Sequence, residues 1–376
     1  MTAYKIVHLT SLHPALDNRI FFKEARSLAQ AGYAVTVIAP HECSTTIDDV
    51  RICAIPREQS RFLRVTKAMW TVYRLAVKEK GDVYHFHDPE LACVGLLLKL
   101  RGKRVVYDVH EDLPRQVQSK EWIPRWLRPI FSGCIRIVEP LFGRLFDRVV
   151  AATPIISQRF PARSTHVVRN FPILDETAEQ EGEPYNQRMP IAVHMSASMS
   201  AARGAIEMVQ AIDLLNGVSS GQLLLIGGIE EDSLRRRLET TKGWHHVDWV
   251  GAKPACEIPR LLSRARVGLC VLHNLRNYRE ALPTKMYEFM AAGIPIVASN
   301  FQLWRGMYEE IGCTLFVDPS NPQQIADAIQ WLLEHQAEAE QMGRKGLEAV
   351  QSRLNWKVEE DTLLRMYEDL ITTPLS

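Results

Sequence analysis

Short apolar runs that alternate with amphipathic helices constrain the fold of this chain more than any other feature. Near the start, residues 5–9 and 33–39 are predicted to be buried strands, and apolar residues at helical spacing predict a helix over 20–31 between them. A strand, a helix and a second strand at this spacing predict parallel neighbours in a doubly wound α/β sheet. Ligands bind at the carboxyl ends of the strands in such sheets.

The length of the chain predicts two domains. A chain of 376 residues exceeds what one hydrophobic core usually supports. Residues 171–189 are rich in Pro, Glu and Gln and show little periodicity, which predicts a linker. We therefore expect domains over 1–170 and 190–354, followed by a final segment over 355–376.

Charge is distributed unevenly between the two halves. Residues 1–170 contain 26 Lys and Arg against 16 Asp and Glu, a net charge of +10, whereas residues 171–376 contain 19 against 28, a net charge of −9. A basic first half indicates an anionic partner, although chance variation of surface charge explains the same numbers.

The cysteines and the start of the chain indicate a cytoplasmic protein. The seven cysteines are scattered and odd in number, and they form no C-x-x-C pair and no Cys/His metal spacing, which fits a reducing compartment. The first residues lead directly into a predicted strand without a signal peptide, and no apolar run reaches the length of a membrane span.

One stretch near the carboxyl end, EALPTKMYEFMAAGIPIVAS, combines a loop, a short helix and a buried strand. Pro283 and Thr284 suit the first positions of a helix. Gly293 suits its C-terminal cap, and Pro295 prevents the helix from continuing. The apolar run that follows is of strand type.

Two carboxylates in this stretch, Glu280 and Glu288, are eight positions apart. The predicted helix N-terminus between them, together with Lys285, would form an anion site. A ligand with hydroxyls at both ends and phosphate in the middle is a nucleotide sugar. A solvated amphipathic helix with Glu and Lys on its outer face explains the same residues, so both interpretations stay open at this point.

The E-x7-E spacing of Glu280 and Glu288, followed by MAAGIPIVAS, resembles the donor-site signature of retaining family 4 glycosyltransferases with the GT-B fold. The resemblance covers nearly the whole chain. It implies two doubly wound Rossmann-like α/β domains facing across a cleft, with a C-terminal helix over 355–376 crossing back to the first domain. It also implies that Glu280 contacts the donor sugar and Glu288 the ribose hydroxyls.

The same resemblance identifies further donor-site residues. Arg203 and Gly204 match a cation and a glycine of the family before a predicted helix, a setting that suits a diphosphate. Ser198 stands where a first cation is expected, and Lys285 would partly compensate for it.

The remaining donor-side residues lie at a strand end and at a helix start. The family holds the nucleotide base at the exit of the strand over 247–251, so we expect the base near residues 250–253, with Val250 and Gly251 as donor-binding residues. Pro283 and Thr284 complete the set at the helix N-terminus.

The loop over 10–19 lies at the exit of the first predicted strand and is expected on the acceptor side, through Asp17, Asn18 and Arg19. Asp17 would contact a sugar hydroxyl and Arg19 a phosphate, or the loop is held by its own Asp–Arg pair. The family often has a glycine pair here. The variant in this chain resembles a subgroup associated with bacterial surface polysaccharides.

His110 follows another predicted strand in Tyr-Asp-Val-His-Glu, and the resemblance implies that it contacts the donor sugar. A histidine that bonds only the backbone is the alternative. Glu111, the next residue, is expected on the acceptor side. We expect polar residues at neighbouring strand exits to converge on one crevice, but for His85, His87 and Asp88 a structural role is favoured.

Residues 120–146 interleave Trp, Phe and Leu with Arg, and the range 115–148 contains seven Lys and Arg against three acidic residues. This pattern is typical of an interfacial membrane helix, which would suit a lipid-linked acceptor. An ordinary helix with its apolar stripe on the sheet and its arginines outward is the alternative. Nucleic acid is not expected, because no recognised binding fold accompanies the charge.

The resemblance implies a retaining glycosyltransferase of the cytoplasm or the inner face of the plasma membrane. It would move a hexose-type sugar from a UDP- or GDP-linked donor to a glycan or lipid-linked oligosaccharide in surface-polysaccharide synthesis, with His110 and Glu280 as catalytic residues. No cofactor is expected, because no G-x-G-x-x-G follows the first strand, and no metal, because no acidic D-x-D occurs. A sugar-nucleotide epimerase and a non-catalytic sugar-nucleotide-binding subunit stay open as alternatives.

Overall fold

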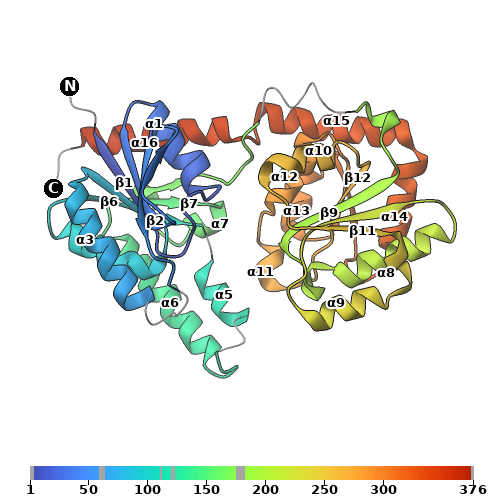
Figure 1. The fold of residues 1–376 in the computed structure, drawn as a ribbon, viewed down its shortest axis with the longest axis horizontal. Helices are drawn as coiled ribbons and strands as arrows, with labels where there is room; N and C mark the ends of the chain where they lie inside the picture. The colour runs from blue at the N-terminus through green and yellow to red at the C-terminus, as the bar shows by residue number, and fades with distance from the viewer. Residues whose placement is uncertain (1–3, 59–63, 111, 120–122, 175–182, 374–376) are drawn as a thin grey trace. The chain divides into compact units, whose positions relative to one another are not determined.

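The computed structural model describes residues 4–58, 64–110, 112–119, 123–174 and 183–373. It divides into two compact units (Figure 1). The amino-terminal unit consists of Met1–Asn170 and Trp356–Ser376, and the carboxy-terminal unit of Phe171–Asn355. Among the described residues, no helix is both long enough and apolar enough to cross a membrane.

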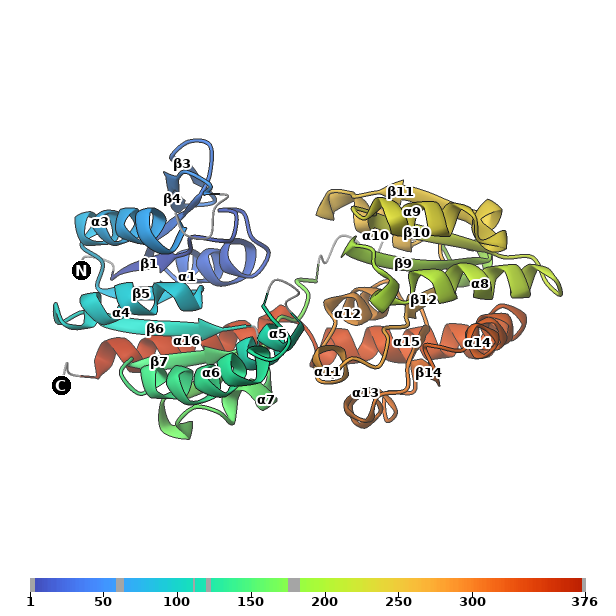
Figure 2. The same cartoon turned by 90° about the horizontal axis from the view of Figure 1, so that it is seen from below.

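Within the described residues, the amino-terminal unit has an eight-stranded sheet in the order β3-β4-β2-β1-β5-β6-β7-β8, which runs from top to bottom in Figure 2. All neighbouring strands are parallel except the β3–β4 hairpin. The strands are β1 (Lys5–Leu9), β2 (Ala34–Pro40), β3 (Thr45–Ile47), β4 (Val50–Ile55), β5 (Val83–Phe86), β6 (Arg104–Val109), β7 (Arg148–Ala151) and β8 (Thr165–Val167).

Helices cover both faces of this sheet, with α1 and α16 on one face and α3 and α6 on the other (Figure 1). The helix predicted over 20–31 is confirmed as η1 (Ile20–Ala25) followed by α1 (Arg26–Gln30). The other helical segments are η2 (Arg64–Ala68), α3 (Met69–Glu79), η3 (Pro89–Leu91), α4 (Ala92–Lys99), α5 (Leu113–Ser119), α6 (Arg128–Gly143), α7 (Pro154–Ser157), η4 (Ala162–Ser164) and α16 (Trp356–Thr372).

The last helix of the chain, α16, belongs to the core of the amino-terminal unit. Its buried residues Leu363 and Met366 pack in one cluster with residues of β1, β2 and α1. At its start, Trp356 Nε1 donates a hydrogen bond to Ser27 Oγ at 2.9 Å. The burial of these apolar side chains anchors the carboxyl end of the chain on a sheet that starts at residue 5.

The carboxy-terminal unit has a fully parallel sheet, six-stranded in the part of the chain that the structure describes, in the order β11-β10-β9-β12-β13-β14. This order is that of a Rossmann fold, with the reversal between β9 and β12. The strands are β9 (Ile191–Ser198), β10 (Gln222–Gly228), β11 (Val247–Gly251), β12 (Val267–Cys270), β13 (Ile296–Ser299) and β14 (Thr314–Val317).

Helices also cover both faces of the second sheet, with α10 and α12 on one side and α8 and α14 on the other (Figure 1). The prediction of two Rossmann-like α/β domains is therefore confirmed. The helical segments are η6 (Tyr185–Gln187), η7 (Ala201–Arg203), α8 (Ala205–Asn216), α9 (Asp232–Glu239), η8 (Lys242–His246), η9 (Ala255–Glu257), α10 (Ile258–Leu262), α11 (Arg276–Arg279), α12 (Thr284–Ala291), α13 (Gln302–Tyr308), α14 (Pro322–Glu334) and α15 (Gln336–Ser352).

The stretch that the sequence singled out has the predicted local structure. Helix α12 starts directly after Pro283, and it ends before Gly293, whose φ is +63°. Strand β13 follows Pro295 and is fully buried. The proline, the left-handed glycine and the second proline thus set the limits of the helix through backbone geometry alone.

Candidate active site

In the carboxy-terminal unit, the sheet reverses its strand order between β9 and β12, which is where open α/β sheets bind their ligands. The turn after β9 leads through Arg203 and Gly204 into α8 and packs against the end of β12. Gly204 has a φ of +71°, and a Cβ atom there would lie 2.1 Å from the carbonyl oxygen of Val271. The two segments can approach this closely because the residue is glycine.

Arg203 lies at the carboxyl end of β9. Its Nη1 donates a hydrogen bond to Ser196 Oγ, and that hydroxyl donates to the carbonyl oxygen of Ser198 at 2.9 Å. Ser198, which replaces the first expected cation, therefore takes part in this network through its backbone. Arg203 remains as the cation of the turn.

Lys285 is a buried cation in the first turn of α12. Its Nζ lies 3.4 Å from Nε2 of His194, and Nδ1 of His194 lies 2.9 Å from the Leu269 carbonyl oxygen. Burial, reinforced by the charge of Lys285, lowers the pKa of His194 well below its usual value. The neutral ring donates from Nδ1 to the carbonyl, so Nε2 accepts from the ammonium group.

Burial also lowers the pKa of Lys285 to about 8, and the charge of Arg203 contributes to this shift. The two cations therefore act on one another at the end of β9 and the start of α12. A buried cation with a histidine nitrogen as its hydrogen-bond partner gains from a nearby anion, because its charge is poorly solvated.

Glu280 follows α11 and lines a pocket of about 1120 Å³ at the carboxyl ends of β12, β13 and β14. Trp304 holds the start of the next loop, because its Nε1 donates to the Ala281 carbonyl oxygen at 2.8 Å. The pocket is lined in addition by Asn274, Arg276, Arg279, Asn300, Phe301, Gln302, Leu303, Phe316, Asp318, Pro319 and Gln324.

The other donor-side residues lie at two places in the same unit. Pro283 and Thr284 form the N-terminus of α12, and Glu288 is half-buried in its second turn. Val250 and Gly251 end strand β11, where Gly251 has a φ of +70°. The structure thus brings Arg203, Gly204 and Lys285 into one group, while Val250 and Gly251 end a strand at the edge of the sheet.

In the amino-terminal unit, His110 follows β6 and belongs to a polar group at the strand ends. Its Nδ1 lies 3.2 Å from Asp108 Oδ2, and its Nε2 lies 3.2 Å from Nε2 of His13. His13, Asp88 and His110 all line one small pocket, together with His87. The expected convergence of polar residues at strand exits therefore holds for this unit.

Asp108 connects this pocket to the interior. Its carboxylate accepts two hydrogen bonds from Arg19, at 2.9 and 2.8 Å, and one from Nδ1 of His87 at 2.9 Å. Burial opposes the charge of Asp108, but Arg19 and the two histidines hold its pKa well below the usual value. An ionised carboxylate only accepts hydrogen bonds, so His87 and His110 both carry a proton on Nδ1.

The structure corrects the expectation for Arg19. Its side chain is 4% exposed, and its guanidinium is occupied by Asp108 and by the carbonyl oxygen of Val168. Arg19 therefore does not reach an acceptor phosphate in this structure. The alternative expected Arg19 to pair with Asp17 of the same loop. Its guanidinium pairs with Asp108 instead.

Asp17 has a structural contact as well. Its Oδ1 accepts from the backbone N–H groups of Arg19 and Ile20, at 2.8 and 3.0 Å, which caps the start of η1. Burial opposes ionisation, but the bond from His13 helps to hold the pKa of Asp17 below its usual value. Asn18 is exposed, and Glu111 lies outside the described residues.

Two polar residues of this group, His13 and Asp108, were missed in the sequence, and the contacts of Asp88 agree with the structural role favoured for it. Asp88, for which a structural role was favoured, accepts bonds from Thr10 Oγ1 and from the backbone N–H of Ser11 and Leu12, and so shapes the first loop. His13 and Asp108 were not singled out. Their positions at the exits of β1 and β6 were the available signal.

Comparison with known proteins gives a consistent result. Two family descriptions match the chain, "Glycosyltransferase Family 4" over residues 18–170 and "Glycosyl transferases group 1" over residues 177–349. A phosphatidyl-myo-inositol mannosyltransferase of Mycobacterium leprae is 22% identical over 93% of this chain and 91% of that protein. Spore coat protein SA of Bacillus subtilis is 31% identical over 33% of this chain, and the match spans only 32% of that protein.

Solved structures share the fold at low identity. Sucrose-phosphate synthase from Thermosynechococcus elongatus has a TM-score of 0.75 at 20% identity and covers 98% of this chain and 99% of its own. HepE from Anabaena, solved in complex with UDP and glucose, has a TM-score of 0.71 at 13% identity, covering 97% of this chain and all of its own. These likenesses establish the GT-B fold of this chain.

The tight turn after β9 gives a testable prediction. We expect Gly204→Ala to lower the free energy of unfolding by at least about 2 kcal/mol, because the new Cβ atom meets the Val271 carbonyl and the residue keeps a positive φ. Urea unfolding measures the change.

Gly306→Ala is the matched control. Gly306 lies in α13, is exposed and has open space around a Cβ atom, so alanine should stabilise the protein by up to about 1 kcal/mol. Equal effects of the two substitutions would contradict the close approach at Gly204.

Proposed function

This chain is a glycosyltransferase of the GT-B type, and we propose that it transfers a hexose-type sugar, with retained configuration, from a UDP- or GDP-linked donor to a glycan or lipid-linked oligosaccharide. The observation that carries the proposal is the buried Lys285 beside Arg203 at the reversal point of a Rossmann-like sheet. The UDP and glucose bound by HepE and the mannosyltransferase activity named for the Mycobacterium relative support it.

In this proposal, the cations stabilise the leaving group. Loss of the sugar leaves a nucleoside diphosphate with increased negative charge, and Arg203, Lys285 and the N-terminus of α12 would stabilise it. Fixed charges in a poorly solvated site need little reorganisation during the reaction, so they lower the barrier more than water does. The diphosphate itself would then help to remove the proton of the acceptor hydroxyl.

The carboxylates and His110 would orient the sugars. We assign Glu288 to the ribose and Glu280 to the donor sugar, because carboxylate oxygens accept from hydroxyls. Within the amino-terminal unit, His110 donates from Nδ1 to Asp108, and its Nε2, which lies 3.2 Å from Nε2 of His13, would contact a sugar hydroxyl. Asp17 and Asn18 stay proposed as acceptor-side residues.

Helix α6 supports a proposed contact with an anionic membrane surface, and so an acceptor linked to lipid. It buries Ser132 and Glu139 towards its own unit and exposes Ile130, Ile137 and Leu141. On its inner side, Phe142 of α6 packs against the core of the unit, so the helix both covers the sheet and presents an apolar outer side. Exposed arginines flank the exposed apolar side chains, at positions 125, 136 and 144. Positions 120–122 of the predicted segment lie outside the described residues.

Donor binding is tested by thermal unfolding of the full chain with UDP- and GDP-sugars. We expect one nucleotide class to raise the Tm, because a ligand at 100 times its Kd stabilises the native state by about 2.7 kcal/mol. Glu288→Ala should remove most of the shift, whereas Glu310→Ala, at an exposed position beyond α13, should keep it.

Two results would count against this assignment. A rise in Tm of equal size in Glu288→Ala would show that Glu288 does not hold the ribose. A shift without any sugar transfer to acceptors would favour the non-catalytic binding subunit.

The low pKa of Lys285 predicts a pH-dependent donor affinity. A lysine is cationic below its pKa, so with a pKa of about 8 the charge is largely present at pH 7 and largely absent at pH 9. We expect the Kd for the nucleoside diphosphate to rise about tenfold between these values, measured by calorimetry. Lys285→Gln should bind weakly at both pH values, and a wild-type Kd that is constant over this range would contradict the role.

Membrane contact is tested by cosedimentation with vesicles of neutral or mixed neutral and anionic phospholipids. We expect binding to the anionic vesicles, and we expect Ile137→Asp to weaken it, because the 66% exposed side chain of Ile137 would enter the lipid interface. Val218→Asp alters a still more exposed apolar residue of the other unit, 76% exposed, and should have no effect. Binding that is unchanged in Ile137→Asp would refute α6 as the contact.

A further inference from the structure

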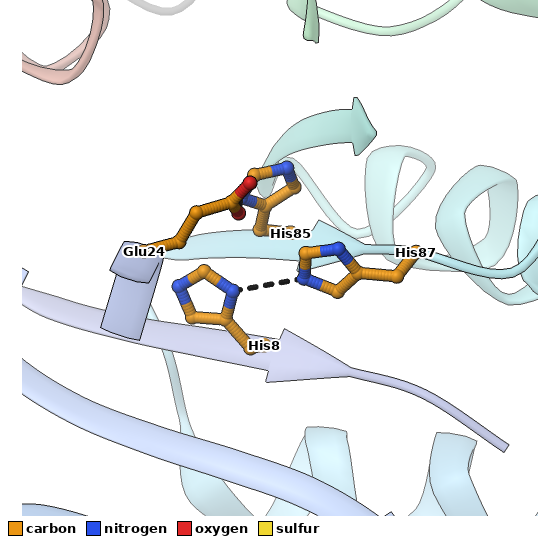
Figure 3. Close-up of side chains that lie close together, drawn as sticks. All are labelled: His8, Glu24, His85 and His87. Carbon is orange, nitrogen blue, oxygen red and sulfur yellow. Dashed lines mark hydrogen bonds and ion pairs between the residues drawn. The ribbon is translucent and has the colours of Figure 1, made fainter. Parts of the chain in front are cut away.

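Three histidines and one glutamate gather inside the amino-terminal unit (Figure 3). His8 comes from β1, His85 from β5, His87 from the residue after β5, and Glu24 from η1. All four side chains are at most 1% exposed. They lie where the strand order of the first sheet reverses, between β1 and β5.

Several polar atoms of this cluster lack hydrogen-bond partners among the described residues. They are Nε2 of His8, Nε2 of His85 and both carboxylate oxygens of Glu24. Glu24 is held by charge, with Oε1 3.1 Å from Arg19 Nε. Polar atoms of His85 and Glu24 without hydrogen bonds in one buried cluster indicate a bound species that completes them, because buried polar groups are normally paired.

The arrangement of donor atoms fits a metal ion. One nitrogen or oxygen from each of the four residues lies within 4.8 Å of the other three. Nδ1 of His8 and Nε2 of His87 are 3.0 Å apart, so an ion bound by both would replace the hydrogen bond between them. We propose that His8, Glu24, His85 and His87 bind a divalent transition metal ion.

The surrounding contacts orient the proposed ligands. Nδ1–H of His87 donates to Asp108, which leaves Nε2 as a lone pair directed at His8. His85 Nδ1 lies 2.9 Å from the hydroxyl of Tyr367 on α16. Histidines that bind metals usually direct their other nitrogen to such a partner.

The donor set favours borderline metals. Three imidazoles and one carboxylate suit Zn²⁺, Fe²⁺ or Co²⁺, whereas Mg²⁺ and Ca²⁺ prefer oxygen ligands. No metal was expected from the sequence, because no acidic D-x-D occurs in it. The ligands of this site come from three separate segments, at residues 8, 24 and 85–87, so they do not form one local motif.

The ion would act as a positioning element. His87 lines the small pocket that also contains His110, so an ion has access to the cluster from that side. His87 and His110 share Asp108 Oδ2 as their acceptor. An ion on His87 would therefore fix the carboxylate that orients His110, without taking part in the transfer.

Metal content and cobalt binding test the proposal. The full chain, purified without a histidine tag, should contain about one equivalent of a transition metal by mass spectrometry. After treatment with a chelator it should take up one equivalent of Co²⁺ with visible d–d bands and a raised Tm. Less than about a tenth of an equivalent as isolated, together with no uptake of Co²⁺, would overturn the site and leave a water network as the occupant.

Variants locate the ion. Glu24→Gln keeps the shape of the side chain and should weaken Co²⁺ binding at least about tenfold, and Tyr367→Phe, which alters only a supporting contact, should weaken it about tenfold. His245→Gln with His246→Gln removes a surface histidine pair and should change nothing. Wild-type affinity in both Glu24→Gln and Tyr367→Phe, loss of binding in the surface variant, or thiolate charge-transfer bands from the exposed cysteines would each refute the assignment.

Discussion

The amino-terminal unit depends on one buried ion pair, between Arg19 and Asp108. The Asp108 carboxylate accepts hydrogen bonds from Arg19 at the start of η1 and from His87 and His110, which follow β5 and β6. Removing one partner from a buried pair costs about 3–5 kcal/mol, because the other charge stays unpaired. The first loop, two strand exits and the pocket at His110 are thus held in register by one carboxylate.

The buried charge in the carboxy-terminal unit, that of Lys285, has a different kind of partner. Lys285 has a neutral histidine rather than a carboxylate as its hydrogen-bond partner, and its pKa falls accordingly. Burial disfavours the charged form of both side chains, but Asp108 offsets this cost at Arg19, whereas Lys285 has no carboxylate hydrogen-bond partner among the described residues. Each sheet reverses its strand order once, but the buried cation near the reversal is paired with a carboxylate in one unit and with a neutral histidine in the other.

The sequence correctly predicted those features of the structure that depend only on residues close together in the chain. Pro283, Gly293 and Pro295 were enough to place α12 and β13, because each restricts its own backbone. The contact of Arg19 with Asp108 spans 89 residues and could not be deduced from the nearby Asp17. Helical periodicity likewise revealed the apolar stripe of α6 but not its direction. That direction is set by distant partners, because Glu139 turns inward to meet the hydroxyl of Tyr107.

The amino-terminal unit builds its core from both ends of the chain. Its core includes Leu363, Met366 and Tyr367, so the sheet that begins at Lys5 buries its second face only when the end of the chain is present. The carboxy-terminal unit is continuous over Phe171–Asn355 and closes its core without such a long-range contact. Because Tyr367 also supports His85, the residue that completes the core also orients part of the buried histidine cluster. Closure of long loops is entropically costly, so packing of α16 couples the order of that cluster to the folding of the whole chain.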